Sequence, residues 1–260
     1  MRLPLYQIDA FADRVFAGNP AAVVPLDAWM PEERMQAIAA ENNLAETAFF
    51  VREGDGWRLR WFTPTVEVDL CGHATLASAW LIANRLEPGR TKMRFASKSG
   101  PLEVTCKGDQ LWLDFPARPP EPCGTPPGLA EALGRKPRDT LKWRDFMLCL
   151  YDGESDVAAL TPDMMSLGKL PFFGVIASAP ATGVDFVSRF CAPAVGIPED
   201  PVTGGAHCVL IPYWAKRLGK RAMAARQISA RGGDVACEER GDRVGIGGRA
   251  VLYLEGTIEV

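Results

Sequence analysis

Short apolar stretches, each bounded by glycine, proline or charged turns, recur along the whole chain. In the first half they predict strands at 5–11, 22–26, 47–51, 57–62, 102–106 and 111–115. In the second half they predict strands at 146–151, 173–178, 227–230, 244–246 and 251–254. Apolar residues at helical spacing predict helices at 31–42, 73–84, 127–133, 156–170 and 204–218. Many short strands with a few helices indicate an α+β protein.

A proline-rich segment at 116–127 separates the two halves of the chain. Six of its twelve residues are proline, so it is expected to be stiff and non-helical. We therefore expect an N-terminal lobe over residues 1–118 and a C-terminal lobe over residues 119–260. The final strand is expected to be able to pack back on the N-terminal lobe.

Each half contains a glycine turn that leads into an apolar helix. The first turn is Cys71-Gly72-His73-Ala74, and the second is Thr203-Gly204-Gly205-Ala206. Neither helix has a strongly polar face in its first three turns, which predicts burial in the centre of a lobe. Pro212 predicts a kink or an irregular turn in the second helix. The repeat predicts two pseudo-symmetric lobes of mostly antiparallel strands around a central helix, with the active site between the two turns.

The composition narrows the classes of function. Apolar residues make up 47% of the chain and charged residues 23%, and the formal net charge is −3. This balance indicates a globular protein and gives no basic face for a nucleic acid. The seven cysteines are scattered without CxxC spacing, so we expect neither a disulfide framework nor a structural zinc site. No apolar run has the length of a membrane span or the form of a signal peptide, which favours a cytoplasmic protein.

The two glycine turns are candidate anion-binding sites. The first amides of a helix have no intrahelical partner, and the helix dipole makes that end positive. The only two histidines lie in these turns. His73 is at a helix start, where the dipole disfavours its cation and predicts a neutral hydrogen-bonding group. His207 lies one turn deeper and is expected to pack or to orient its neighbours.

Other side chains near the turns could carry chemistry. Glu46 stands where a helix gives way to an apolar strand, so it is expected to be partly desolvated and suited to proton transfer. The alternative for Glu46 is a solvated position at a strand edge. Asp200 could cap the second helix or act as a catalytic carboxylate, and Cys71 could be a thiolate at a helix start. Lys98 and Ser99 are weaker candidates for substrate contacts.

Several motifs occur in the order typical of one protein family. They are Gln7–Phe11, Phe16–Pro20, Asn43–Phe49, Arg60–Pro64, Asp69–Thr75, Asp185–Phe190, Pro193–Gly204 and Gln227–Gly233. Together they span nearly the whole chain, which resembles the phenazine biosynthesis PhzF-like family of isomerases. The resemblance implies a diaminopimelate epimerase-like fold with the active site between two lobes.

The resemblance also implies a reaction and a set of site residues. Glu46 matches the family's catalytic acid/base, His73 its motif histidine and Asp200 its second carboxylate; Gly72, Gly204 and Gly205 are expected to bind the substrate. The implied activity is a metal-free and cofactor-free isomerisation of a small carboxylated substrate by proton transfer between carbons, as for dihydro-hydroxyanthranilate in the best-known member. Members of the family are typically homodimers. One position departs from the pattern: the family usually has Thr-Gly-Ser where this chain has Thr203-Gly204-Gly205, so a side-chain hydroxyl is lost.

Two other functions remain open from the residues. One is a racemase or epimerase with a cysteine at each turn; Cys71 would supply the first thiol, but Thr203 stands at the matching second position, and Cys208 lies a turn further along the helix. The other is a small-molecule-binding protein that has lost its chemistry, which only Gly205 favours.

Overall fold

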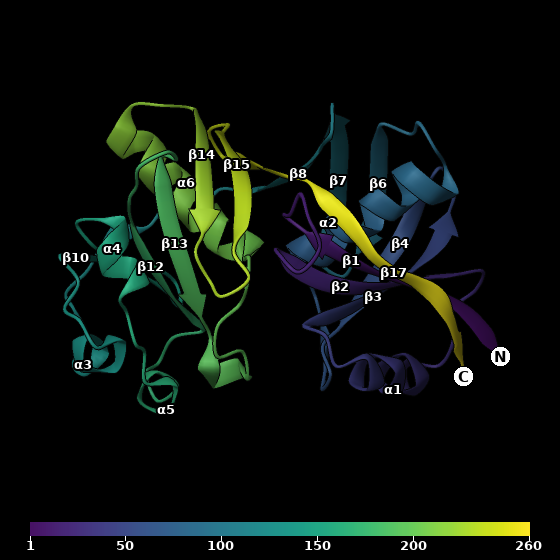
Figure 1. The fold of residues 1–260 in the computed structure, drawn as a ribbon, viewed down its shortest axis with the longest axis horizontal. Helices are drawn as coiled ribbons and strands as arrows, with labels where there is room; N and C mark the ends of the chain where they lie inside the picture. The colour runs from purple at the N-terminus through teal and green to yellow at the C-terminus, as the bar shows by residue number, and fades with distance from the viewer. The chain divides into compact units, whose positions relative to one another are not determined.

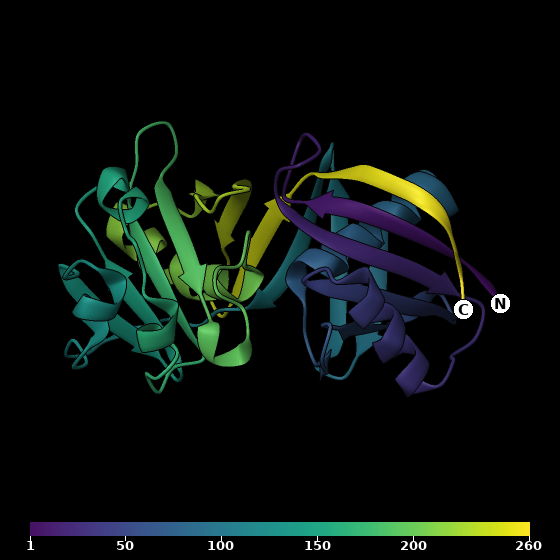
Figure 2. The same cartoon turned by 60° about the horizontal axis from the view of Figure 1, so that its bottom comes forward.

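The chain folds into two compact units, shown in Figure 1. The structure is a computed structural model that describes all 260 residues. Unit 1 contains Met1–Asp114 and Gly247–Val260, and unit 2 contains Phe115–Ile246. The chain leaves unit 1 just before the proline-rich segment. It returns for its last strand, β17, which lies beside β1 in Figures 1 and 2.

The strands of unit 1 follow one another through paired edges from β17 to β1, β2, β3, β4, β6, β7 and β8. The pairs β2–β3 and β4–β6 are parallel, and the others in this series are antiparallel. The short strand β5 adds to β4. The bounds are β1 Arg2–Ala10, β2 Asn19–Leu26, β3 Glu46–Glu53, β4 Gly56–Phe62, β5 Glu67–Val68, β6 Lys92–Ser97, β7 Gly100–Lys107, β8 Gln110–Pro116 and β17 Ala250–Glu259.

Unit 2 repeats this arrangement in its series from β10 through β11, β12, β13 and β14 to β15. Here β11–β12 and β13–β14 are the parallel pairs. The bounds are β9 Glu121–Pro122, β10 Asp139–Trp143, β11 Phe146–Leu150, β12 Gly174–Pro180, β13 Phe186–Cys191, β14 Ala222–Gln227, β15 Gly233–Glu239 and β16 Arg243–Gly248.

The internal repeat is therefore visible in the strand pairing. From β1 to β7 the successive pairs are antiparallel, parallel, antiparallel, parallel and antiparallel. The pairs from β10 to β15 follow the same order. A parallel pair needs a long crossover, and in each unit the second crossover carries the apolar helix. This confirms the predicted α+β architecture of two pseudo-symmetric units.

The two crossover helices are α2 (Gly72–Leu81) and α6 (Gly204–Leu218). Nearly every residue of α2 is buried, and it packs against β1, β2, β3 and β17 (Figure 1). In α6 the Trp214 ring stacks on Phe186 of β13 at 5.4 Å. Both are the central helices that their apolar sequences predict. The α-helical part of this segment ends at Leu81, earlier than predicted, and the chain then forms a π-helix, η1 (Ile82–Leu86).

The helix α6 continues without interruption through Pro212. A proline has no N–H, so the carbonyl of Cys208, four residues earlier, loses its helical partner. That carbonyl instead accepts a hydrogen bond from the Arg118 amide at 2.9 Å. The predicted irregular turn is absent, and the connector satisfies the carbonyl that the proline leaves open.

Two predicted elements are wrong. The single helix at 156–170 is replaced by two short helices, α4 (Glu154–Ala158) and α5 (Met164–Leu167), because Pro162 stands between them and cannot continue a helix. The strand predicted at 227–230 lies earlier, as β14, and Ile228–Ala230 belong to the turn that follows it.

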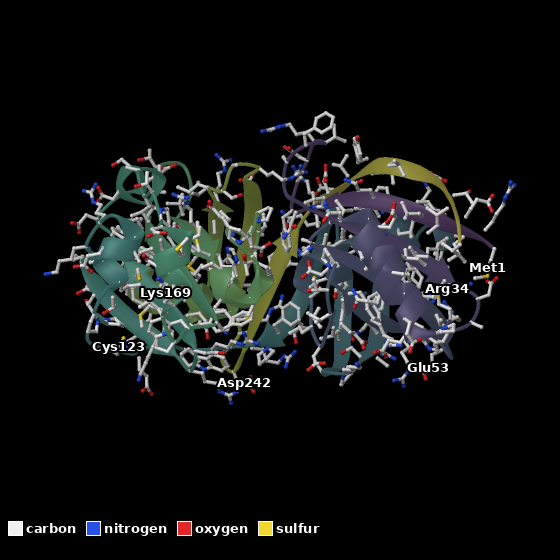
Figure 3. All side chains as sticks on the ribbon, turned by 90° about the horizontal axis from the view of Figure 1, so that it is seen from below. Met1, Arg34, Glu53, Cys123, Lys169 and Asp242 are labelled. Atoms are coloured by element: carbon white, nitrogen blue, oxygen red, sulfur yellow. The ribbon has the colours of Figure 1, made fainter.

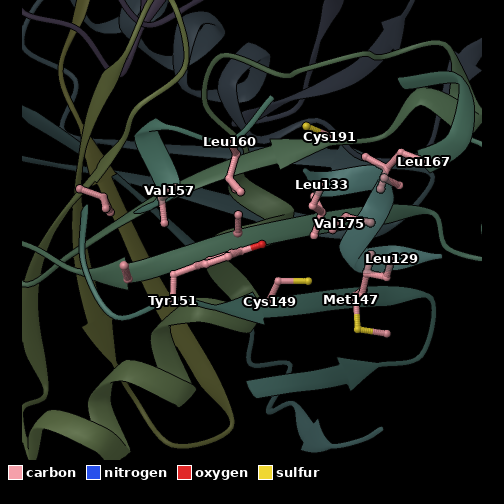
Figure 4. Close-up of a cluster of buried hydrophobic side chains, with 14 residues drawn as sticks. Leu129, Leu133, Met147, Cys149, Tyr151, Val157, Leu160, Leu167, Val175 and Cys191 are labelled. Atoms are coloured by element: carbon pink, nitrogen blue, oxygen red, sulfur yellow. The ribbon is translucent and has the colours of Figure 1, made fainter. Parts of the chain in front are cut away.

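The remaining helices pack against the strands through apolar residues spaced along one side of each helix. The helix α1 (Glu32–Asn42) buries Met35, Ile38 and Ala39, and it leaves Arg34 on the exposed side (Figure 3). In unit 2, α3 (Leu129–Leu133) and the helices α4 and α5 pack with β11 and β12 around the cluster in Figure 4. This cluster includes Leu133, Met147 and Val175. No helix combines the length and hydrophobicity that crossing a membrane requires.

Candidate active site

The first glycine turn lies where β5 gives way to α2. Cys71 is the N-cap residue, with extended backbone angles (φ −142°, ψ 116°), and α2 begins at Gly72. The Cys71 side chain makes no capping hydrogen bond to the first turn. The buried hydroxyls of Thr75 and Ser78 bond back to the carbonyls of Cys71 and Ala74, so they do not compete for the first amides. The start of α2 can therefore accept an external anion.

Glu46 reaches this turn from a different element. The helix α1 ends at Asn42, the left-handed φ of 49° at its C-cap Asn43 turns the chain, and β3 begins at Glu46. The Asn42 side-chain amide donates to Thr47 Oγ1 at 3.1 Å and fixes the junction. The parallel pairing of β2 with β3 sets Glu46 opposite Ala21. The Glu46 side chain is only 12% exposed, so the partly desolvated carboxylate expected from the sequence is present.

Glu46, Cys71 and His73 form one cluster at the start of α2. The His73 Nε2 atom lies 3.1 Å from Glu46 Oε2, and the His73 side chain is 6% exposed. The buried Glu46 Oε2 atom has no hydrogen-bond partner, so this contact is not a hydrogen bond. We therefore describe the contact as a close electrostatic pair. On the other side of the ring, Cys71 Sγ lies 3.5 Å from His73 Nδ1.

The ionisation of the cluster follows from its neighbours. Burial, reinforced by the Glu46 carboxylate, raises the pKa of the Cys71 thiol to about 11, so this thiol is uncharged at neutral pH. Burial alone lowers the pKa of His73, but the Cys71 sulfur and the Glu46 carboxylate outweigh it and raise that pKa well above 6.5. The expectation of a neutral His73 is wrong, since it considered the helix dipole without the carboxylate beside the ring.

The same three side chains are the group that could hold a metal ion. One donor atom from each of Glu46, Cys71 and His73 lies within 4.8 Å of the others. A divalent ion here would have to displace the thiol proton, because a cysteine binds metals as the thiolate. The raised pKa of Cys71 makes that displacement costly at neutral pH.

The second glycine turn is held by a buried glutamine. Gln227, at the end of β14, is fully buried. Its Oε1 atom accepts the Thr203 amide at 2.9 Å, and its Nε2 atom donates to the carbonyl of Asp200 at 2.7 Å. The Thr203 hydroxyl donates to Asp200 Oδ2 at 2.5 Å, and Ser229 Oγ donates to the carbonyl of Pro201. These contacts fix the backbone that leads into α6.

The N-cap of α6 resembles that of α2. Thr203 is extended (φ −119°, ψ 105°), and its side chain makes no capping bond because the hydroxyl is directed to Asp200. A Cβ atom placed on Gly205 would lie 3.7 Å from Arg118 Nη1 and 3.8 Å from the Phe146 ring, which are ordinary contacts. Packing therefore does not require glycine at this position.

His207 has the role expected of a packing residue. It is fully buried, and its Nδ1 atom donates to the Thr203 carbonyl at 2.8 Å. The Nε2 atom of His207 has no hydrogen-bond partner. Burial lowers the pKa of His207 to about 4, so this ring is neutral at physiological pH.

The structure brings the predicted residues together in two groups. Glu46, Gly72 and His73 meet in unit 1, and Asp200, Gly204 and Gly205 meet in unit 2. The weaker candidates already have partners: Lys98 pairs with Glu67, and Ser99 donates to the carbonyl of Asp69. Sequence reasoning missed the roles of Gln227 and Arg118. Gln227 is the first residue of the motif Gln227–Gly233, which could have indicated its role. The proline-rich segment contains no comparable signal for Arg118.

Comparison with known proteins places the chain in a family. The profile of the phenazine biosynthesis-like family, PhzC-PhzF, matches residues 8–256. An uncharacterized isomerase of Pseudomonas aeruginosa is 55% identical over 261 residues, covering 100% of both chains. The crystal structure of a PhzF family protein from Enterococcus faecalis superposes with a TM-score of 0.97 at 48% identity, also covering 100% of both chains.

A more distant structure shares the fold alone. It is a hydroxyproline epimerase from Agrobacterium vitis, with a TM-score of 0.64 at 11% identity, over 99% of this chain and 92% of that one. The fold is therefore the predicted diaminopimelate epimerase-like one. The chain belongs to the phenazine biosynthesis-like family, PhzC-PhzF, whose members include proteins named as isomerases.

Proposed function

We propose that this protein is a cofactor-independent and metal-independent isomerase in which Glu46 moves a proton between two carbons of a small carboxylated substrate. The observation that carries the proposal is the pairing of Glu46 with His73 across 3.1 Å at the uncapped start of α2. A proton-transfer group must be close to the substrate and held in one orientation. The start of a buried helix supplies a binding point for an anion beside that group.

The proposed reaction balances without a further reactant. The Glu46 carboxylate takes a proton from an activated carbon, and the C–H electron pair enters the conjugated system of the substrate. The same carboxyl group then returns the proton to another carbon, so the substrate is isomerised and Glu46 is restored. The His73 imidazolium and the amides at Gly72 would stabilise the negative charge that develops between the two steps.

The second glycine turn is proposed to bind the substrate. The amides of Gly204 and Gly205 suit an anionic group, and the Asp200 carboxylate, held by Thr203, suits a hydroxyl or amine. The clamp by Gln227 supports this role because it fixes the backbone of the turn.

The thiol-based alternative is less well supported. A racemase of that type needs one cysteine as a thiolate and a second as a thiol. Burial raises the pKa of both Cys71 and Cys208 to about 11, so neither is a ready base at neutral pH.

The direct test is solvent-deuterium incorporation into a panel of cyclic dienes and amino acids that carry a carboxylate, with chelator present throughout. We expect the wild-type protein to exchange at least one cyclic diene, and Glu46→Gln to lose about 10²–10⁴-fold in rate, the usual contribution of a general base. Glu41→Gln is the matched control, since Glu41 is exposed near the end of α1. No exchange by the wild-type protein would favour the binding protein without chemistry, and exchange that Glu46→Gln retains would refute the assignment.

A further inference from the structure

Arg118, in the proline-rich segment, is held at the start of α6 by its own backbone. Its amide donates to the carbonyl of Cys208, which is open because Pro212 lacks an N–H. The connector is therefore attached to the second turn of the helix. The position of the Arg118 side chain follows from this attachment.

The Arg118 guanidinium rests on two aromatic rings. Its central carbon lies 4.8 Å from the Trp143 ring centroid and 5.5 Å from that of Phe146. Phe146 is itself held by Phe173 at 5.2 Å and by Phe190 at 6.0 Å. A guanidinium whose face is stacked keeps the N–H groups of its edge directed sideways, in the plane that suits two-point binding of a carboxylate.

The same guanidinium has no partner of opposite charge within the protein. It makes no ion pair and no hydrogen bond, although it is half-buried. Other half-buried arginines are neutralised: Arg60 binds Glu67 through two nitrogens, and Arg189 binds Glu199 in the same way. A cation that is fixed and partly desolvated without a counter-ion costs free energy unless a ligand supplies the charge.

The unpaired edge lies next to Gly205. The Arg118 Nη1 atom is 3.7 Å from the point where a Gly205 side chain would begin. A Cβ atom would fit here at ordinary contact distances, so Gly205 leaves the position of a side chain beside Nη1 unfilled. A serine at position 205, as in the pattern of the family that the sequence resembles, would begin its side chain at this position.

We infer that Arg118 is a specificity-determining residue that binds the carboxylate of the substrate in two-point fashion. The inference rests on the proposed function, since it assigns a partner to the carboxylate proposed there. In this assignment the anion lies between Arg118 and the start of α6, on the side where Gly205 carries no side chain.

The test compares two fluorescent probes of nearly the same shape, 2-aminobenzoate, which carries a carboxylate, and 2-aminobenzamide, which carries a neutral carboxamide in its place. We expect the wild-type protein to bind the carboxylate at least about tenfold more tightly than the amide, as a charge-assisted pair of hydrogen bonds implies. Arg118→Met should reduce this preference to below about twofold, and Arg118→Lys should retain part of it, because a lysine keeps the charge without the planar fork.

Arg144→Met is the matched control. Arg144 also stacks on Trp143, at 4.7 Å, but it is exposed. It should keep the full preference for the carboxylate, and thermal melting should show all variants folded. The inference is overturned if the wild-type protein has no preference, if Arg118→Met keeps it, or if Arg144→Met loses it equally. Loss of exchange in Glu46→Gln does not depend on these probes, so either proposal can fail while the other stands.

Discussion

At the scale of single residues, the charge of His73 shows why a local argument fails. A helix dipole disfavours a cation at the helix start by roughly 0.3–1 kcal/mol. Two unit charges about 4 Å apart attract by roughly 4 kcal/mol at an effective dielectric constant of 20. Glu46, 3.1 Å from the ring, therefore outweighs the helix dipole at His73, although it comes from β3 and is 27 positions away in the chain.

The two histidines provide a direct test of this account, since the chain has no others. In ¹⁵N NMR spectra recorded across a pH series, we expect one imidazole to titrate well above 6.5 and the other at about 4. Glu46→Gln should lower the higher value and leave the lower one unchanged, because the carboxylate beside His73 is removed. Two ordinary titrations near 6.5 would contradict the geometry of both sites.

At the scale of elements, the sequence predicts the bounds of a helix well where the local pattern is strong. It predicts strands poorly where their pairing depends on distant segments. The helix at 204–218 matches its prediction in both bounds, and the start of α1 differs by a single residue, because apolar spacing and the flanking turns define them. The strands β6, β10, β13 and β15 were not predicted, and β14 was placed too late. The strands β13 and β14 pair in parallel although they are far apart in sequence, which no local pattern records.

The residues of the candidate site also fall into those that the sequence predicts and those that only the fold reveals. Glu46, His73 and Asp200 could be found from motifs, whereas the clamp by Gln227 needs the fold, since 24 positions separate Gln227 from Thr203. Burial also decides the role of Cys71: its place at a helix start favours a reactive thiolate, but burial raises the pKa of the thiol to about 11.

The clamp predicts an unequal cost for two similar substitutions. Gln227→Met should destabilise the protein by about 3 kcal/mol, because it leaves the Thr203 amide and the Asp200 carbonyl buried without a partner. Gln36→Met removes one hydrogen bond from a half-buried side chain, to Thr63, and should cost about 1 kcal/mol. Urea unfolding measures both, and equal losses would show that the clamp adds nothing to the turn.

At the scale of the whole molecule, the two histidines should give stability opposite dependences on pH. The raised pKa of His73 contributes stability that is present below 6.5 and is lost as the pH rises through the folded-state value. His207 behaves in the reverse sense. Between 6.5 and about 4 the unfolded chain takes up a proton there that the folded chain does not, so stability falls as the pH falls.

The contribution of His207 can be isolated with one variant. Over that window it should amount to about 3 kcal/mol, at about 1.4 kcal/mol per pH unit. His207→Asn keeps a donor near the Thr203 carbonyl but cannot titrate, so its free energy of unfolding should fall less steeply between pH 7 and pH 4. Parallel curves for the two proteins would show that His207 is not held neutral.

The central claim, that Glu46 rather than a thiol moves the proton, is tested most directly by comparing two variants in the deuterium assay. For a substrate that the wild-type protein exchanges, Glu46→Gln should lose about 10²–10⁴-fold in rate. Cys71→Ser should stay within about tenfold of the wild type, because the buried thiol takes no proton in the proposed reaction. The reverse result, with Cys71→Ser inactive and Glu46→Gln active, would contradict the account.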